Sequence, residues 1–398
     1  MASIYGFVQR LYKASVPPRC AKSTDSPMIR FGILGAANIA PAALLKPVLS
    51  HPEAVVYAVA ARSLEKAQAF ARKHSIEKAY GGPTAYQELL DDPNVDAIYN
   101  PLPNGLHYEW TMKALHAGKH VLLEKPSSDT ADETREMFEY AKSKGLVLLE
   151  AFHYRFHPAI HRVKAILDNG ELGAIKHVEV TMKLPKGFAA DDDIRFNYEL
   201  GGGIMMDMGC YTVNCLRYIL GTDPLEVLSS ISDLMPTNDG SPSKVDTGTT
   251  ATFAFPGDAT GTVTCHMRVP YMLGFIPHFP TILLTVHCEN GELKMFNFVM
   301  PSMYHTIEVS AGDWKGNKSM KKRIEKVYKP TEPGAKGEEW WTTYRYQLEA
   351  FVDKVKGLTP EYWLPAEDAI SNMTWVEKVY EKTGLGSRPQ SNFKLPIP

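Results

Sequence analysis

The chain has 398 residues, of which 44% are hydrophobic and 22% are charged, and its formal net charge is -2. This length favours two domains, and the composition is typical of a soluble globular protein. The nearly balanced charge gives no electrostatic reason to expect nucleic acid or an anionic membrane as a partner. No apolar run is long enough to span a bilayer.

The first 27 residues are expected to form an arm and a linker. Apolar residues recur there at helical spacing, and no acidic residue precedes Asp25. Two interpretations stay open: a short amphipathic helix that lies on its own protein or on a partner subunit, and a mitochondrial presequence. We favour the helix because Ser and Arg are few. Five scattered cysteines without a C-x-x-C pair favour free thiols, and we expect a cytoplasmic protein.

Residues 28–151 alternate short apolar runs with helical patterns. The runs are continuous, which is typical of parallel strands covered on both faces. Such an alternation predicts a doubly wound α/β domain of the Rossmann type. We expect strands at 29–34, 55–61, 97–100, 120–124 and 147–151, and helices at 41–50, 63–74, 110–117 and 131–144.

Residues 152–398 are richer in strands, and turn signals separate consecutive strands without intervening helices. The sequence therefore predicts an α+β domain for substrate binding and dimerisation, with a large, mainly antiparallel open sheet. The last two helices are expected in this domain or returned to the Rossmann domain, and the basic segment 313–337 as a solvated loop. Strands are expected at 175–184, 225–234, 247–255, 261–269, 281–288 and 292–298, and helices at 158–169, 210–220, 341–357 and 368–384.

The turn at 32–40 lies between the first strand and the first helix, where a dinucleotide fingerprint belongs. Gly35 is at the tight turn, and Ala37 is where the backbone approaches the pyrophosphate. Because glycine is usual at the second position, Ala37 predicts a negative φ or a slightly more distant phosphate. Asn38 and Ile39, which lead into the helix, complete the expected anion site at its N-terminus.

Arg62 and Ser63 follow the second strand, where an NAD enzyme usually has an acidic residue for the ribose hydroxyl. An arginine can bind a 2′-phosphate through two hydrogen bonds and stack on adenine. The alternative is a surface arginine without a role. The sequence predicts NADP as the cofactor, with NAD as the alternative.

Three further segments carry a family resemblance: Asn-Pro-Leu-Pro-Asn-Gly-Leu-His at 100–107, Glu-Lys-Pro at 124–126, and the Gly-rich segment 200–211 that ends in Asp-x-Gly-x-Tyr. With these motifs the chain resembles the Gfo/Idh/MocA oxidoreductases from about residue 29 to 386. Many members of this family have histidine at the position of Tyr211. With a tyrosine there, the chain resembles the subgroup of D-xylose 1-dehydrogenases, dihydrodiol dehydrogenase and glucose–fructose oxidoreductase.

The resemblance implies a catalytic set of Lys125, Asp207 and Tyr211. A lysine at the carboxyl end of a parallel strand lies where open α/β sheets bind ligands. Its charge can stabilise a developing alkoxide and lower the pKa of a nearby phenol, which would make Tyr211 a general base. Lys125 as a surface lysine and Tyr211 as a core residue are the alternatives. The expected cofactor contacts in these motifs are Pro101, Leu102, Asn104, His107, Glu124 and Lys125.

Arg155, Asp207 and Tyr211 are the expected substrate-binding residues, and Arg195 is expected in a loop that closes over the substrate. His107 is expected either to stack near the nicotinamide or to cap a helix. His153, His157 and His161 recur every four residues, but Pro158 interrupts that helix. We therefore expect no metal site.

The sequence predicts an NADP-dependent dehydrogenase that oxidises an aldose, with D-xylose as the leading substrate, at C1 to its lactone. A trans-1,2-dihydrodiol or another sugar or polyol substrate is the alternative within the same class. A regulator that binds NADP without turning it over is the alternative from another class. We also expect a homodimer.

Overall fold

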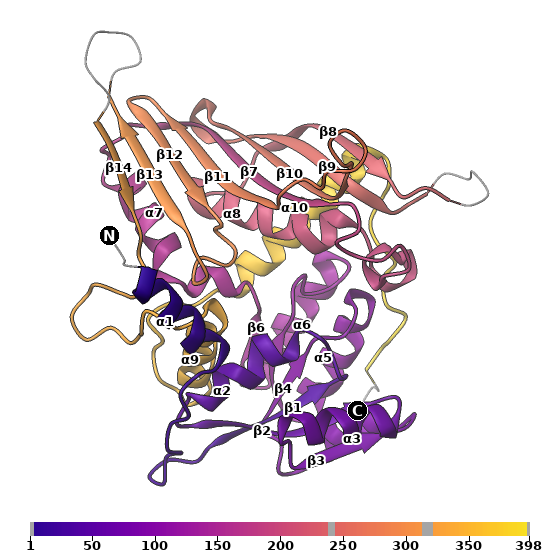
Figure 1. Ribbon diagram of the computed structural model, residues 1–398. Coiled ribbons are helices and arrows are strands. Elements are labelled where there is room, and N and C mark those ends of the chain that lie inside the picture. The colour runs from indigo at the N-terminus through magenta and orange to yellow at the C-terminus, as the bar shows by residue number, and fades with distance from the viewer. Residues whose placement is uncertain (1–3, 238–242, 313–320, 396–398) are drawn as a thin grey trace.

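The computed structural model describes residues 4–237, 243–312 and 321–395, and there the chain forms two sheets (Figure 1). The first sheet has six strands in the order β3-β2-β1-β4-β5-β6, and all of its neighbouring strands are parallel. The second has eight strands in the order β14-β13-β12-β11-β7-β10-β9-β8. The predicted combination of a Rossmann domain with a mainly antiparallel sheet is confirmed.

The Rossmann half follows the predicted alternation, because its central strands are buried on both faces, as continuous apolar runs require. Two elements were not predicted, β3 and α4. The first is half-buried along its length and the second is only two turns long, so neither gives a strong periodic signal. The elements are β1 (Ile29–Leu34), β2 (Ala54–Ala61), β3 (Lys78–Gly81), β4 (Ala97–Asn100), β5 (His120–Leu123) and β6 (Leu148–Glu150), with η1 (Pro41–Leu45), α2 (Lys46–Leu49), α3 (Leu64–His74), α4 (Ala85–Asp91), α5 (His107–His116) and α6 (Ala131–Ser143).

The large sheet is antiparallel except where β10 runs parallel to β7. Burial alternates along β7 and β10, so that one face of the sheet packs on helices. The expected solvated loop at 313–337 is partly wrong: residues 321–325 form the edge strand β14, and residues 313–320 lie outside the described ranges. The strands are β7 (Ile175–Pro185), β8 (Glu226–Leu234), β9 (Asp246–Ala254), β10 (Thr260–Val269), β11 (Thr281–Cys288), β12 (Gly291–Phe296), β13 (Thr306–Ala311) and β14 (Lys321–Glu325).

The two C-terminal helices take different places. α10 (Ala366–Thr383) lies with α7 (Pro158–Asp168) and α8 (Cys210–Leu220) between the large sheet and the Rossmann half, and it also contacts α6 (Figure 1). α9 (Thr343–Val355) packs against the Rossmann half, where Phe351 meets Phe31 at 5.7 Å between ring centroids. The chain after the large sheet therefore helps to fix one half of the molecule against the other.

The N-terminal segment forms the predicted amphipathic helix, α1 (Ile4–Ser15), and it lies on its own chain. The Arg10 guanidinium stacks on the Tyr328 ring at 3.4 Å and donates to the Ser302 carbonyl. The presequence alternative remains a hypothesis. Within the described ranges, no helix is both long and apolar enough to cross a membrane.

Arg388 in the C-terminal tail pairs with Asp246 in the core, and neither side chain is exposed. Asp246 also accepts a hydrogen bond from the backbone of Met205, which begins the turn that bears Asp207. We expect Arg388→Ala to lower the free energy of unfolding by about 3 kcal/mol, because truncation leaves a buried carboxylate without its cation. Urea unfolding measures this, with the exposed Lys394→Ala as control; equal stability of the two variants would contradict it.

Candidate active site

The candidate catalytic residues meet between the two halves of the molecule. Lys125 follows β5 at the carboxyl edge of the parallel sheet, Asp207 lies in the π-helical turn η6 (Met205–Gly209), and Tyr211 lies in α8. The Lys125 ammonium donates to both the backbone carbonyl and the Oδ1 of Asp207, each at 2.8 Å. The two motifs that carried the family resemblance are therefore in direct contact.

The glycine run before η6 allows this close approach of the two halves. Gly201 has a φ of +71°, and a Cβ atom there would collide with Asp129, which follows the Glu-Lys-Pro motif. The Asn104 side chain donates to the Gly201 carbonyl at 3.0 Å, so a predicted cofactor residue also holds the run in place. A bulkier side chain at Gly201 would clash with Asp129 and Asn104, which both lie in the Rossmann half.

Asp207 is shared by two cations, because Arg195 Nε donates to its Oδ2 at 3.0 Å. Burial alone would raise the pKa of Asp207, but Lys125 and Arg195 outweigh burial and hold it below its ordinary value. Burial would likewise lower the pKa of Lys125, yet Asp207 leaves it raised. Both groups are charged at neutral pH, and their side chains keep 14% and 19% exposure, which leaves them open to a small ligand.

The expected activation of Tyr211 by Lys125 is wrong for this arrangement. The ammonium lies over the phenol ring, 5.0 Å from its centroid, and its hydrogen bonds go to Asp207. Burial raises the pKa of Tyr211 well above its usual value, and the neighbouring Tyr344 and Glu124 raise it further. Tyr211 is therefore a neutral phenol in the site, and its hydroxyl lies 3.0 Å from His153 Nε2.

Arg155 does not lie in this group. Its guanidinium is buried and donates to Asn214, Asp368 and Tyr362, so the structure does not support the predicted substrate contact. The family resemblance placed it near the substrate, because this stretch lines the sugar pocket in the resembling subgroup. The side chain, however, points into a polar network between α8 and the start of α10.

His107 begins α5 and is buried, with one ring nitrogen 2.8 Å from the Pro126 carbonyl and the other 2.7 Å from the Leu102 carbonyl. Burial lowers its pKa to about 4. These contacts favour a structural role over stacking on a nicotinamide, because the neutral ring is enclosed between the two loops and its one N–H donates to one of the two carbonyls. Glu124 is also buried and accepts from the Tyr99 hydroxyl at 2.7 Å, which turns it toward the sheet.

The predicted nucleotide turn fits a dinucleotide. Gly35 has a φ of +84°, which favours glycine, and an added Cβ would lie only 3.3 Å from the Leu102 side chain. Ala37 is absent from the described residues with positive φ, which agrees with the predicted negative value. Asn38 and Ile39 are exposed where a phosphate would meet the helix N-terminus, and Pro101 is half-buried across from them at the end of β4.

Arg62 is exposed at the end of β2, where a 2′-phosphate would lie in this fold. Ser63 caps α3 by accepting from the Lys66 backbone at 3.3 Å, so its side chain is already used in the helix. Tyr86 in α4 was missed by the sequence analysis. Its hydroxyl lies close to Gly35, its ring packs edge-on against Trp110, and the charge of Arg62 reaches it. No motif marks this tyrosine, because α4 itself was not predicted.

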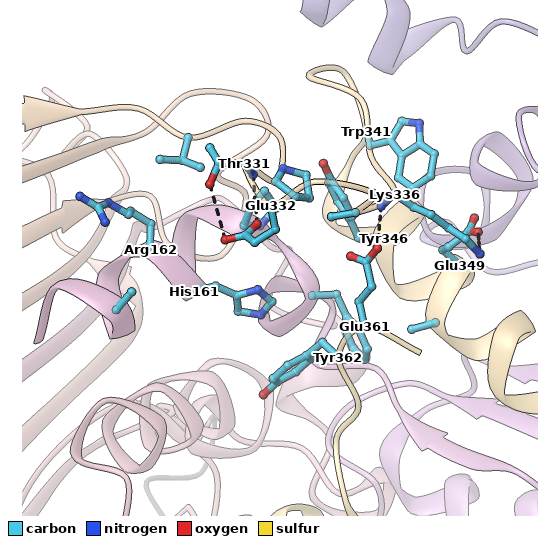
Figure 2. Close-up of a pocket in the computed structure, with 18 of the residues that line it drawn as sticks. His161, Arg162, Thr331, Glu332, Lys336, Trp341, Tyr346, Glu349, Glu361 and Tyr362 are labelled. Atoms are coloured by element: carbon cyan, nitrogen blue, oxygen red, sulfur yellow. Dashed lines mark hydrogen bonds and ion pairs between the residues drawn. The ribbon is translucent and has the colours of Figure 1, made fainter. Parts of the chain in front are cut away.

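A separate cavity of about 850 Å³ lies under the segment 330–336 (Figure 2). Its charged groups are largely paired with one another, as Lys336 is with Glu349 and Asp353. None of the candidate catalytic or cofactor residues lines it. Among the residues that the structure describes, no group of three or more His, Cys, Asp or Glu side chains is arranged to hold a metal ion. All five cysteines are free.

Glu150 at the end of β6 gives the molecule a pH-dependent stability. Burial raises its pKa to about 8, so between the unfolded value near 4.5 and 8 only the folded state binds this proton. The contribution of Glu150 to the free energy of unfolding is therefore fully present below about pH 4.5. As the pH rises from there toward about 8, the free energy of unfolding falls by about 1.4 kcal/mol per pH unit.

We therefore expect Glu150→Gln to lessen the fall in the free energy of unfolding between pH 5 and 8, measured by urea titration at each pH. The amide can keep the hydrogen bond from the Ser127 backbone. The exposed Glu139→Gln on α6 is the control and should keep the wild-type slope. An equal slope in Glu150→Gln would show that Glu150 is ionised in the folded protein.

Comparison with known proteins agrees with this geometry, which is that of a dinucleotide-dependent oxidoreductase. Residues 29–152 match the model of an oxidoreductase family with an NAD-binding Rossmann fold, GFO_IDH_MocA, and residues 160–294 match the GFO/IDH/MocA C-terminal domain. The chain belongs to the GFO/IDH/MocA family of oxidoreductases. The predicted family and enzyme class are confirmed.

Several relatives are similar over much of the chain. It is 33% identical to D-xylose 1-dehydrogenase (NADP(+)) 2 of Haloferax volcanii over 363 residues, 90% of this chain and 98% of that protein. It is 34% identical to the trans-1,2-dihydrobenzene-1,2-diol dehydrogenase of Sus scrofa over 60% of this chain and 68% of that one. The structure of KijD10, a 3-ketoreductase from Actinomadura kijaniata in complex with NADP and TDP-benzene, matches with a TM-score of 0.74 and 27% identity, over 90% and 98% of the two chains.

Proposed function

We propose that this protein is an NADP-dependent sugar dehydrogenase that oxidises an aldose at C1 to its lactone, with D-xylose as the first candidate substrate. The observation that carries the proposal is the contact of Lys125 with Asp207 beside Tyr211, at the carboxyl edge of a nucleotide-binding sheet. The similarity to the Haloferax volcanii enzyme along 90% of the chain supports the choice of substrate.

NADP is proposed over NAD because Arg62, and no acidic residue, follows β2. Gly35 and the exposed residues Asn38 and Ile39 would hold the pyrophosphate, and Arg62 the 2′-phosphate. When bound, NADP supplies the acceptor for the hydride that leaves the sugar carbon. Tyr86 is a further candidate contact on the adenosine side, because its hydroxyl lies near Gly35 and within range of the Arg62 charge.

The chain's own residues then act on the sugar oxygen. Lys125, held by Asp207, places a positive charge where the hydroxyl oxygen gains negative charge as its proton leaves. Tyr211 presents its phenol oxygen to that hydroxyl. Because Tyr211 is neutral, its O–H donates to His153 Nε2 and its oxygen accepts a hydrogen bond from the sugar hydroxyl. The phenol orients the sugar oxygen, and the hydroxyl proton passes to water as the hydride leaves the same carbon for the cofactor. Arg195, in the 3-10 turn Ile194–Phe196, donates to the second carboxylate oxygen of Asp207 and so helps to hold that side chain against Lys125.

A trans-1,2-dihydrodiol substrate is the second candidate, supported by the similarity to the Sus scrofa enzyme. The same residues would serve, because a secondary alcohol loses the same proton and hydride. A regulator that only binds NADP is less well supported. Such a protein would have no use for the Lys125–Asp207 ion pair, which is open to a small ligand. The homodimer and the cytoplasmic location remain predictions; light scattering tests the first and imaging of a tagged full-length chain the second.

The experiment that tests the function is a substrate panel. The protein is incubated with NADP or NAD and with aldoses, polyols or trans-1,2-dihydrobenzene-1,2-diol, and reduced nicotinamide is followed by its absorbance. We expect the highest kcat/KM for an aldose with NADP. A higher kcat/KM for the diol would show that the substrate is a dihydrodiol and would leave the assignment as an NADP-dependent dehydrogenase in place. The absence of turnover with every alcohol would contradict the proposal.

A further inference from the structure

Tyr211 is held by a buried histidine that follows the last strand of the Rossmann half. His153 lies in the 3-10 turn η3 (His153–Phe156), and its side chain is 1% exposed. Its Nε2 is 3.0 Å from the Tyr211 hydroxyl, and its Nδ1 is 2.8 Å from the hydroxyl of Thr343, the first residue of α9. Three groups from three elements thus form one hydrogen-bonded row that ends at the candidate active site.

The row has only two possible directions because His153 is neutral. Burial lowers its pKa to about 3, and the charge of Lys125 acts in the same sense. The Tyr344 ring packs against the imidazole at 4.1 Å between centroids, so the ring is fixed in place. A neutral imidazole carries one N–H donor and one acceptor nitrogen. The hydrogen bonds therefore run either from Tyr211 through His153 to Thr343 or in the opposite sense.

We propose that His153 is a positioning residue that sets the direction of the Tyr211 O–H bond and lets one tyrosine face either an alcohol or a carbonyl. When Nε2 accepts from Tyr211, the phenol oxygen has a lone pair free for a sugar hydroxyl. When Nε2 carries the hydrogen and donates to Tyr211, the phenol hydrogen is free for the carbonyl of the oxidised sugar. The inference rests on the proposed function, because it assigns Tyr211 to the sugar oxygen.

Two substitutions separate hydrogen bonding from packing at this position. His153→Phe keeps a ring against Tyr344 but has no polar atom, whereas His153→Gln loses the ring but keeps a donor and an acceptor near the place of Nε2. We expect kcat to fall about tenfold or more in His153→Phe, the cost of one buried hydrogen bond in the transition state, with an unchanged KM for NADP. His153→Gln should recover most of the loss. Activity in the Phe variant with loss in the Gln variant would overturn the proposal.

Tyr211→Phe, measured in parallel, separates this inference from the proposed function. If Tyr211→Phe is as active as wild type, the role of Tyr211 fails and the positioning role fails with it. If Tyr211→Phe is impaired while His153→Phe is not, the dehydrogenase proposal stands and the positioning role is overturned. Thr343→Val, which removes only the far end of the row, should lower kcat less than His153→Phe.

Nitrogen-15 NMR of histidine-labelled protein gives a readout that needs no substrate. The His153 signals are identified by their loss in His153→Gln. We expect them to show a neutral ring that does not titrate between pH 5 and 8, and to shift in both Tyr211→Phe and Thr343→Val. If the His153 ring titrates in that range, or if its signals do not shift in either variant, the hydrogen-bonded row is contradicted.

Discussion

Lys125→Met should lower kcat/KM for the preferred aldose about 10³-fold, because it removes the positive charge that stabilises the sugar oxygen in the transition state. Methionine keeps most of the aliphatic stem, so the half-buried position beside the Tyr211 ring remains filled. Asp207 keeps Arg195 as a partner, which limits structural damage. Steady-state kinetics with NADP and the aldose measures the effect.

The loss should fall on the chemical step and not on the cofactor. NADPH binding, followed by fluorescence titration, should change little in Lys125→Met. The exposed Lys142→Met in the last turn of α6 is the matched control and should keep wild-type kinetics. If Lys125→Met kept kcat/KM within about tenfold of wild type, the lysine would contribute less than one oxyanion-type donor, and its catalytic role would have to be given up.

Arg62→Ala should weaken NADP binding about 10-fold to 100-fold, the range expected for the loss of a charge-assisted pair with a phosphate. The Kd for NAD should change little, because NAD has no 2′-phosphate. Calorimetric titration with both cofactors measures the ratio directly. Arg72→Ala, at an exposed arginine in the last turn of α3, is the control. An equal loss for NADP and NAD would show that Arg62 does not read the 2′-phosphate.

The Rossmann half was predictable because its signals are local. β1, β2 and β4 are largely apolar, apart from the exposed Arg30 in β1 and Asn100 at the end of β4. The fingerprint at Gly35 needs only the chain order of strand, turn and helix. Of the elements that were missed, α4 is short and β14 is an exposed edge strand rich in basic residues, so both have weak local signals. β13 was also missed, although its burial alternates. Lysines on an edge strand hinder the pairing of that strand with other chains. A sequence so rich in lysine predicts a loop, which is why β14 was not expected.

The sequence singled out Lys125, Asp207 and Tyr211, which the structure brings together, but it did not predict the contacts among them. Lys125 and Asp207 are 82 residues apart, and only the packing of η6 against the end of β5 brings the ammonium to the carboxylate. Tyr211 was expected to be activated by that ammonium, but its burial and its contact with His153 depend on how α8 packs against η3. The prediction that Arg155 contacts the substrate was wrong for the same reason. Its guanidinium donates to Asn214 in α8 and Asp368 in α10, and only the packing of these two helices brings those partners to it.

Transfer of deuterium from D-xylose labelled at C1 to NADP tests the central claim most directly. The account predicts that the wild-type protein forms reduced cofactor that carries the deuterium, with slower turnover than for unlabelled sugar and with the lactone as product. Lys125→Met should form little of it. Reduced cofactor without deuterium would mean that another carbon is oxidised, and no reduction with any aldose would mean that the protein is not a sugar 1-dehydrogenase.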